Sequence, residues 1–293
     1  MLPKLILVAI CLIPLAILLP QIHLQRRKLR RTVKSPFTDL LLRPAGESLR
    51  LKIGELDEKL NDHLLSALAY PLMVAAFLFL TIPHQERPIP FLIVCVPIVS
   101  VFIGGTYFIW GRKIPKLWME IRDHELGFQG ERYVGEELNQ LLKEGFRVFH
   151  DLEFDRFNID HVLVGPPGVF AVETKTRRKP IGEKGKAAHK VIFDGGKLHY
   201  PWGQDTHGLK QAKRNADHLA TWLSSATGEK VNVEAILTLP GWWVERTGRG
   251  TVHVVNTKEI PKIFPRNPPS PLSPEQIQRI AHQIEQKCRN LEV

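Results

Sequence analysis

The stretch IDHVLVGPPGVFAVETK, residues Ile159–Lys175, places three charged side chains in two otherwise apolar runs. The charged residues are Asp160, Glu173 and Lys175. A Pro-Pro sequence separates the two runs, and short apolar runs on either side of a turn signal are typical of a β-hairpin. The three charges are therefore either scattered surface charges or parts of one site.

The two apolar runs, about residues 158–164 and 169–176, are predicted to pair as antiparallel strands. If the turn is centred on the two prolines, Asp160 lies directly opposite Glu173, where Cβ atoms are about 4.5–5.5 Å apart. Lys175 shares this face, because side chains alternate along a strand. A turn with an odd number of residues would instead shift the register by one and place the two acids on opposite faces.

The predicted register brings two carboxylates together, with an amine two residues along. Like charges directly opposite one another destabilise a sheet, so the arrangement calls for a compensating cation. Two carboxylates and a backbone carbonyl suit Mg²⁺, a hard ion that takes oxygen ligands. Such an ion lowers the pKa of bound water and stabilises charge on a phosphate. The alternative is an exposed sheet face on which the lysine bridges the acids.

The sequence around this hairpin predicts a mixed α/β domain. Apolar residues at helical spacing indicate a helix over about residues 129–144, which Gly145 ends, and FRVFHDL indicates a strand before the hairpin. One sheet with helices packed against it is therefore expected. The later elements expected are a small hairpin in KVIFDGGKLHY, a helix in HGLKQAKRNADHLATWLSS, strands in VNVEAILTLP and TVHVVN, and a last helix capped by Ser273.

The pattern D-x(12)-E-x-K on a hairpin resembles the active site of the PD-(D/E)xK nuclease superfamily. The longer pattern of GERYVGEEL, IDHVLVGPPGVFAVETK and LKQAKRNADHL resembles the NERD, or nuclease-related, domain over roughly residues 125–260. Ile159 stands where the superfamily motif has proline. The resemblance implies an α/β, restriction-endonuclease-like αβββαβ core, a mixed sheet flanked by helices. It also implies metal-dependent cleavage of phosphodiester bonds.

The resemblance implies roles for four residues of the hairpin. Asp160 and Glu173 would be ligands of Mg²⁺ or Mn²⁺, and the Thr174 carbonyl would be a third ligand. Lys175 would be the catalytic lysine, which orients or deprotonates the attacking water or neutralises charge at phosphorus.

Two helical residues also match positions of the superfamily. Glu131 matches an acid of the first helix that faces the metal site and often serves as a further ligand. The alternative is a first-turn glutamate that complements the helix dipole. Gln211 in the second helix matches a glutamine near the catalytic site, and a polar residue on a solvated helix edge is the alternative.

A basic segment follows the hairpin and is expected to bind the nucleic-acid backbone by charge, without reading sequence. A solvated loop, or one lying on anionic lipid, is the alternative. Trp202, Trp242 and Trp243 can stack on bases, although packing in the core or near the membrane is favoured. The cations assigned to nucleic-acid binding are Arg177, Arg178, Lys179, Lys184, Lys186, Lys190, Lys210, Lys213 and Arg214.

Three uncharged apolar segments, residues 5–24, 64–83 and 89–110, predict about three transmembrane helices, since about 20 residues cross the hydrocarbon core. A cleaved signal peptide is the alternative for the first segment. The basic run QRRKLRR directly after it favours a retained anchor and a cytoplasmic location for that end. The expected protein is multi-pass in the cell (inner) membrane, with the N-terminus outside and the nuclease-like domain in the cytoplasm.

The composition and charge of the chain limit the classes of function that it can have. The net charge of +10 at pH 7 fits an anionic partner or an anionic membrane surface. The three cysteines form neither a disulfide framework nor a zinc motif. The predicted spans hold no Asp, Glu, Lys or Arg, so a transport pathway has no residues to use.

The sequence thus predicts three regions: a membrane anchor at residues 1–120, a NERD domain at 121–265, and a Pro-rich linker with a C-terminal helix at 266–293. The expected function is a membrane-anchored, Mg²⁺-dependent endonuclease whose partners are the lipid bilayer and nucleic acid, with DNA favoured over RNA. The alternative is a catalytically inactive nuclease-fold module that binds nucleic acid or protein partners at the membrane.

Overall fold

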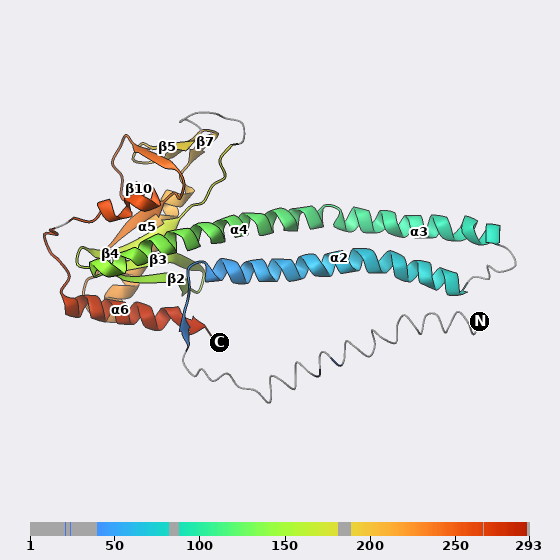
Figure 1. The fold of residues 1–293 in the computed structure, drawn as a ribbon, viewed down its shortest axis with the longest axis horizontal. Helices are drawn as coiled ribbons and strands as arrows, with labels where there is room; N and C mark the ends of the chain where they lie inside the picture. Colours follow the sequence, from blue (N-terminus) through green and yellow to red (C-terminus); the bar gives the residue numbers. More distant parts are fainter. Residues whose placement is uncertain are drawn as a thin grey trace. The chain divides into compact units, whose positions relative to one another are not determined.

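The computed structural model describes residues 21, 24, 40–81, 88–180, 189–265 and 267–291. The chain forms two compact units (Figure 1). The helical unit contains Glu55–Ile121, and the α/β unit contains Asp39–Gly54 together with Arg122–Val293.

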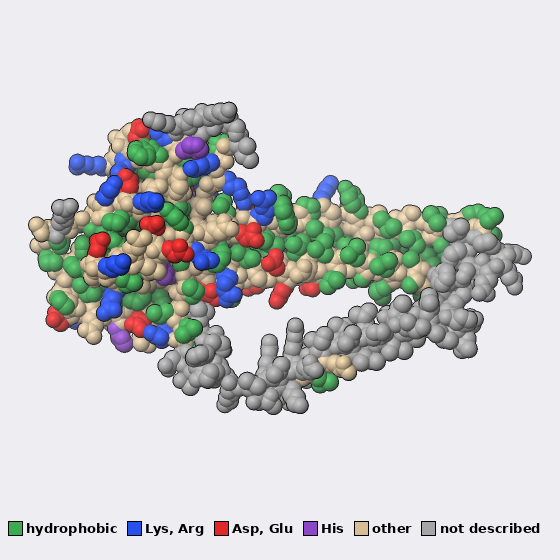
Figure 2. All heavy atoms as spheres, viewed as in Figure 1, with side chains coloured by type: hydrophobic (Ala, Val, Ile, Leu, Met, Phe, Trp, Pro, Cys, Tyr) green, Lys and Arg blue, Asp and Glu red, His purple; other side chains and the backbone are tan. Residues whose placement is uncertain are grey.

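The helical unit is built from apolar helices. Helix α2 is Glu47–Thr81, of which the part after Gly54 belongs to this unit, and helix α3 is Pro88–Trp110. The Tyr70 ring of α2 stacks on the Trp110 ring of α3, with ring centroids 5.8 Å apart. Helix α3 and the second half of α2 present mostly hydrophobic side chains at the surface (Figure 2). Such a surface is stable in lipid but unusual in water.

The prediction of three membrane spans is supported for one helix. Among the described residues, one helical stretch, Ile93–Glu144, is long and apolar enough to cross a membrane, judged by length and composition. It contains most of α3, so the predicted helix at 89–110 is confirmed as a helix. Apart from residues 21 and 24, the expected segment 5–24 lies outside the described part of the chain.

The expected helix at 64–83 is not a separate element. Its described residues are the second half of α2, which begins at Glu47. The preceding residues, ESLRLKIGELDEKLNDH, are mostly good helix formers with no proline, so no signal ends the helix where the composition changes. The charged and apolar halves therefore form one continuous helix of 35 residues.

The first helix of the α/β unit is longer than predicted. Helix α4 is Lys113–Leu138, its first residues belonging to the helical unit, and a 3₁₀ turn, η1, continues it over Asn139–Glu144. Gly145 ends it with φ 85°, a left-handed conformation that glycine adopts without strain, so the predicted stop is confirmed. The predicted start at residue 129 is wrong, because Gly127 and Gly130 do not break the helix.

A mixed five-stranded sheet forms the centre of the α/β unit, in the order β10-β8-β4-β3-β2. Strands β2, β3 and β4 are antiparallel, while β4, β8 and β10 are parallel. The chain order α4-β2-β3-β4-α5-β8 gives the predicted αβββαβ core. The bounds are β2 Arg147–Phe154, β3 Phe157–Gly165, β4 Gly168–Thr174, β8 Val233–Thr238 and β10 Val252–Val255.

A second, four-stranded sheet has the order β7-β6-β5-β9. Its β5 and β6 form the predicted small hairpin, whereas β7 and β9 had no clear sequence signal, since both are short and carry mixed side chains. The bounds are β5 Lys190–Phe193, β6 Leu198–Tyr200, β7 Gly203–Asp205 and β9 Trp243–Arg246.

The register of the central hairpin is the predicted one. Val164 pairs with Val169, and Gly165 pairs with Gly168 on either side of the two-residue Pro-Pro turn. His161 pairs with Val172, so the next pair along this register is Asp160 with Glu173. The turn has an even number of residues, and the two acids therefore share a face.

Apolar side chains cover both faces of the central sheet. On one face, helices α5 (His207–Thr227) and α6 (Pro274–Cys288) pack against Val162 and Val164. On the other, α4, η1 and the 3₁₀ turn η3 (Thr257–Lys262) pack against Leu163. Because side chains alternate along β3, the strand contributes apolar residues to two cores, one on each face of the sheet. Ser273 caps α6 as predicted, with Gln276 completing a capping box.

An N-terminal segment far from the domain in sequence belongs to the α/β unit. Strand β1, Leu41–Leu42, pairs with β11, Arg289–Leu291. Next to it, the Arg43 guanidinium binds the fully buried Asp151, Nη2 to Oδ2, at 2.8 Å. The same carboxylate accepts the Ser48 N–H at 2.7 Å and the Asn158 side-chain N–H at 2.7 Å. These bonds hold Asp151 at a positive φ of 50°.

Replacement of Arg43 by alanine is expected to destabilise the α/β unit strongly. The change leaves the Asp151 carboxylate buried without its cation, and loss of one partner of a buried ion pair costs about 3–5 kcal/mol. The measurement is denaturant unfolding of the full chain in detergent micelles, followed by tryptophan fluorescence. Arg279→Ala is the matched control, because its 2.9 Å pair with Glu229 is exposed and worth about 0–1 kcal/mol. Equal, small losses in the two variants would contradict a structural role for Arg43.

Candidate active site

The carboxylates of Asp160 and Glu173 lie side by side on the two central strands β3 and β4. Asp160 is 5% exposed and Glu173 is 2% exposed. These exposures exclude the alternative in which both acids sit on a solvated sheet face. Two buried like charges on neighbouring strands are costly, so the fold keeps them at the expense of stability.

Both oxygens of Glu173 accept hydrogen bonds. The Lys175 ammonium donates to Oε1 at 2.7 Å, and the Asn215 side-chain amide of α5 donates to Oε2 at 3.0 Å. The Lys175 side chain is 19% exposed, so the amine reaches the surface beside the buried acid. Its backbone N–H donates to the Thr238 carbonyl at 3.0 Å, which continues the pairing of β4 with β8 past the end of the strand.

Asp160 is held by the backbone of the facing strand. Its Oδ2 accepts the Thr174 N–H at 2.7 Å. Burial raises the pKa of Asp160 well above its usual range, and the charges of Glu173 and Glu131 raise it further. Burial also raises the pKa of Glu173, although the adjacent Lys175 opposes this shift. The pair therefore resists ionisation of both members when no cation is present.

Glu131 belongs to the same cluster. It lies in the interior of α4, which begins at Lys113, so the alternative of a first-turn glutamate at the helix dipole is wrong. Its side chain is buried, and its Oε2 has no hydrogen-bond partner among the described residues. Burial, then the charges of Asp151 and Glu173, raise the pKa of Glu131 to about 8.

The donor set fits a hard divalent cation. Asp160, Glu173 and Glu131 offer carboxylate oxygens, and Mg²⁺ is held in proteins by one or two carboxylates with several waters. Burial, and after it the neighbouring carboxylates, raises the pKa values of Glu131 and Asp160, and a bound cation would oppose these shifts. Across the described residues, no group of three or more His, Cys, Asp or Glu side chains already has the spacing of a metal centre.

Asn215 is the residue that the sequence analysis missed. It is buried, and its Nδ2 donates to Glu173 while its Oδ1 has no partner among the described groups. Gln211, the predicted helical residue, is half-buried one turn earlier, and the bond to Glu173 comes from Asn215 instead. A signal was present, because Asn215 shares the apolar stripe of α5 with Ala212, Ala216 and Leu219.

A chain of two histidines supports Thr174 from the opposite side of the sheet. The Nδ1 atoms of His150 and His161 are 2.9 Å apart, and His161 Nε2 lies 3.3 Å from the Thr174 hydroxyl. Burial lowers the pKa of His150 to about 4 and that of His161 well below its usual range, so both are neutral at pH 7. A neutral imidazole ring has one donor nitrogen and one acceptor nitrogen. The two rings can therefore form a row of hydrogen bonds that all run in the same direction, and this row fixes the end of β4.

The predicted nucleic-acid cations fall into three groups. Four are paired with carboxylates, and two lie outside the described residues. Lys179, Lys210 and Arg214 are exposed. The pairs are Arg177 with Asp205, Arg178 with Asp123, Lys190 with Glu245, and Lys213 with Asp217. Lys184 and Lys186 are the two in residues 181–188. Much of the predicted charge is thus partly neutralised within the fold.

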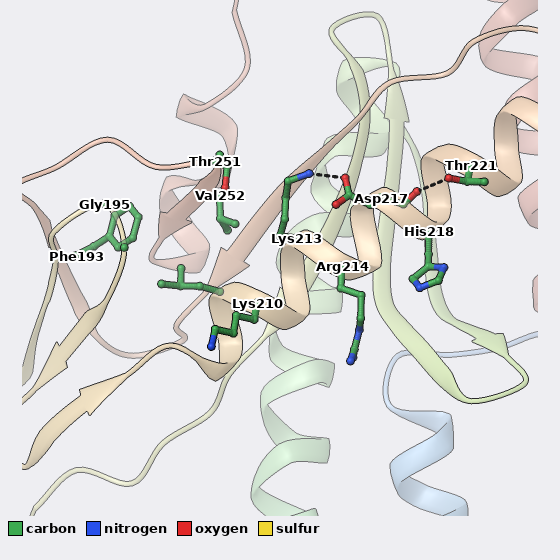
Figure 3. Close-up of a pocket in the computed structure, with 12 residues that line it drawn as sticks. Phe193, Gly195, Lys210, Lys213, Arg214, Asp217, His218, Thr221, Thr251 and Val252 are labelled. Carbon is green, nitrogen blue, oxygen red and sulfur yellow. Dashed lines mark hydrogen bonds and ion pairs between the residues drawn. The ribbon is translucent and has the colours of Figure 1, made fainter.

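The exposed side of α5 borders a groove of about 570 Å³. Figure 3 shows Lys210 and Arg214 extending from the helix, while Lys213 turns back to Asp217. The turn at Gly195 and the residue Thr251 form the facing wall. Arg214 also lowers the pKa of Glu173, which places this part of α5 next to the acidic cluster.

Comparison with known proteins supports the resemblance to a nuclease fold. The model of the NERD family, described as the Nuclease-related domain, matches residues 126–240. This match covers Glu131, Asp160, Glu173, Lys175 and Asn215. No curated protein and no solved structure matches the chain. The nuclease-related domain is therefore identified within the α/β unit.

Asp160→Asn is expected to stabilise the protein at pH 7 when divalent cations are removed. The raised pKa means that the folded state disfavours the charged form, so ionised Asp160 lowers stability once the pH exceeds its unfolded pKa. Asparagine keeps an oxygen that can accept the Thr174 N–H but removes the charge. We expect the free energy of unfolding in EDTA to rise by about 1 kcal/mol or more.

The measurement is denaturant unfolding of the full chain in detergent. Asp155→Asn is the matched control, because Asp155 is exposed between β2 and β3 and its change should stay within about 0.5 kcal/mol. A loss of stability in Asp160→Asn would show that the carboxylate is not under electrostatic strain.

Proposed function

We propose that the α/β unit is a metal-dependent nuclease that hydrolyses phosphodiester bonds of nucleic acid. The observation that carries the proposal is the buried group of Asp160, Glu173 and Glu131, next to a partly exposed lysine amine. A structural ion pair needs one acid for one lysine. The surplus carboxylates have a physical reason when a divalent cation binds to them.

Each residue of the site has a defined task in the proposed reaction, and Glu173 has two. Asp160 and Glu173 would hold Mg²⁺ or Mn²⁺, with Glu131 and the Thr174 carbonyl as further ligands, and the ion would supply Lewis-acid chemistry at a phosphate. Lys175 binds a phosphate oxygen or the attacking water through its ammonium group. In the overall reaction water adds to phosphorus, the bond from phosphorus to the leaving oxygen breaks, and that oxygen gains a proton.

Glu173 and Asn215 act by positioning. Glu173 fixes the Lys175 amine at 2.7 Å from its Oε1, so the lysine does not have to be ordered when substrate binds. Asn215 fixes the other oxygen, Oε2, and thereby the rotation of the carboxylate. A preorganised acid and amine reduce the reorganisation that the reaction requires.

The proposed substrate is nucleic acid, with DNA favoured over RNA, bound through its backbone. Lys210 and Arg214 line the groove along α5 and can bind phosphates without reading bases. Lys213 and the cations of the segment after β4 extend this surface when phosphate replaces their carboxylate partners. These are Arg177, Arg178, Lys179, Lys184, Lys186 and Lys190.

We further propose that the chain is anchored in the cell membrane by its apolar segments. The support is the exposed apolar surface of α3 and of the second half of α2, together with the sequence of residues 5–24. The basic run after residue 24 and the cations that follow α3 favour a cytoplasmic location for those ends. This topology leaves the α/β unit in the cytoplasm and the N-terminus outside.

The full chain in detergent is expected to cleave nucleic acid with Mg²⁺ or Mn²⁺ and not with EDTA. Plasmid, linear and single-stranded DNA and RNA are offered in parallel. Glu173→Gln and Lys175→Ala should each lower the rate by about 10²–10⁴-fold. Lys143→Ala, an exposed lysine of η1, is the matched control and should cleave normally.

A second measurement on the same samples separates binding of the ion from turnover. Mg²⁺ should raise the unfolding temperature of the wild-type chain but not that of Asp160→Asn. If the wild-type chain cleaves nothing and its unfolding temperature does not change with Mg²⁺, yet it still binds nucleic acid, the result would favour the inactive binding module instead.

Asn215→Ala is expected to reduce cleavage more than Gln211→Ala. Asn215 donates to Glu173, whereas Gln211 lies one turn away, so only the first change frees the carboxylate. We expect about a tenfold lower kcat for Asn215→Ala, from the loss of one positioning hydrogen bond. KM should be little changed, because Asn215 is buried away from the groove. A larger effect in Gln211→Ala would return the supporting role to the residue predicted from the sequence.

A further inference from the structure

A second concave surface lies outside the acidic cluster and the α5 groove. This aromatic cavity has a volume of about 590 Å³ and is lined by aromatic and basic side chains. Its walls come from α4, the segment after β4, strand β9 and the turn η3. The aromatic and basic residues of the lining include Tyr133, Lys179, Trp242, Trp243, Lys258 and Lys262.

The two adjacent tryptophans of this cavity are in opposite environments. Trp242 is 1% exposed, and its indole N–H donates to the Arg177 carbonyl at 3.3 Å. Its ring meets the Tyr200 ring edge-on, with centroids 5.5 Å apart. Trp243, which begins β9, is 69% exposed. Trp242 therefore belongs to the core, as the sequence favoured, while Trp243 presents a large flat face to solvent on a fixed backbone.

The cavity has an excess of positive charge. Lys179, Lys258 and Lys262 are exposed, and none of them pairs with a carboxylate among the residues that the structure describes. The acid in the lining, Glu259, is already within 3.5 Å of Arg246. Lys179 Nζ lies 5.7 Å from the centre of the Trp242 ring, so this amine is held over the cavity floor. The unneutralised lysines fit an anionic ligand.

The aromatic cavity adjoins the candidate active site through shared segments. Lys175 and Lys179 both lie in the segment that follows β4, and the carbonyl of Arg177 between them accepts a hydrogen bond from the Trp242 indole. Helix α4 supplies Glu131 to the acidic cluster and Tyr133 to the cavity. Thr176 packs against Gly130 of α4, where a larger residue would collide with the threonine hydroxyl, so the two segments are in close contact.

We propose that the aromatic cavity is a subsite for single-stranded nucleic acid. Trp243, with Tyr133 beside it, stacks on an unpaired base, and Lys179, Lys258 and Lys262 bind the flanking phosphates. An aromatic face combined with nearby cations is the general way in which proteins bind single strands, since every base offers a π face. A paired base is buried in the duplex stack and cannot reach Trp243. Binding of a single strand at this cavity does not require the proposed nuclease function. Only the purpose of that binding rests on it.

The test measures binding with cleavage switched off. The full chain in detergent carries Glu173→Gln and is kept in EDTA, and the probes are fluorescein-labelled oligothymidylate, oligouridylate and a DNA duplex. Trp243→Ala and Trp243→Leu should bind both single strands about tenfold more weakly, with duplex binding unchanged. Trp243→Phe should retain most of the affinity, because it keeps an aromatic face. Leucine keeps apolar bulk without that face, which separates stacking from burial.

The lysines are tested by salt dependence. Lys179→Ala should reduce the slope of log affinity against log salt by about one unit for single strands. Lys143→Ala, which changes an exposed lysine outside the cavity, should leave the slope as it is. Equal slopes for the two variants would remove Lys179 from the subsite.

The outcomes distinguish the subsite from the nuclease proposal. If all Trp243 variants bind single strands like the parent, or lose duplex and single-strand binding alike, the subsite is wrong even when the wild-type chain cleaves. If the wild-type chain never cleaves but Trp243→Ala and Trp243→Leu weaken single-strand binding selectively, the nuclease proposal fails and the subsite stands. If vesicles of anionic lipid bind the parent and Trp243→Ala equally, and neither protein prefers single strands to duplex, the lysines belong to a membrane-binding surface instead.

Discussion

The register between β3 and β4 is the constraint on which the candidate site depends. A two-residue turn at Pro166-Pro167 fixes this register, and the register alone places Asp160 beside Glu173. A shift of one residue would send one acid to the α4 side of the sheet and bury an apolar side chain in its place. Apolar residues on both faces of β3 oppose such a shift, because each face packs against its own helices. The packing of the whole α/β unit thus protects the geometry of two carboxylates.

The electrostatics of the site follow from that geometry. Three buried acids, Asp160, Glu173 and Glu131, influence one another electrostatically, and the Lys175 amine hydrogen-bonds to Glu173. Asn215 and the Thr174 N–H contribute dipoles, which reduce the cost of the charges without cancelling it. The raised pKa values of Asp160, Glu173 and Glu131 express the remaining cost. The divalent cation proposed for this site would reduce that cost by binding to the carboxylate oxygens.

The sequence predicted the hairpin, its register and the αβββαβ order because these depend on local patterns. Alternation, a Pro-Pro turn and a helix stop at Gly145 are all readable within a few residues. Strand β9 and the start of α4 were not predictable, since neither has a local boundary signal. The sequence pointed to Gln211 and not to Asn215 for a different reason. The two residues are one turn apart, and only the rotation of α5 on the sheet decides which of them meets Glu173. The exposed Trp243 likewise follows from a strand that has no pattern of its own.

The segment before α2 shows how a long-range contact can tune this cluster. Asp151 is buried in β2, and its charge is one of those that raise the pKa of Glu131. Arg43 neutralises Asp151 through two hydrogen bonds, from Nε at 2.9 Å and from Nη2 at 2.8 Å. Without Arg43 the uncompensated charge of Asp151 would act more strongly on Glu131. The guanidinium therefore supports both the fold and the electrostatics of the site. A fragment beginning at residue 111 would lack Arg43 and the β1 strand. The smallest fragment that keeps the contacts of the α/β unit therefore has to include residues 39–54.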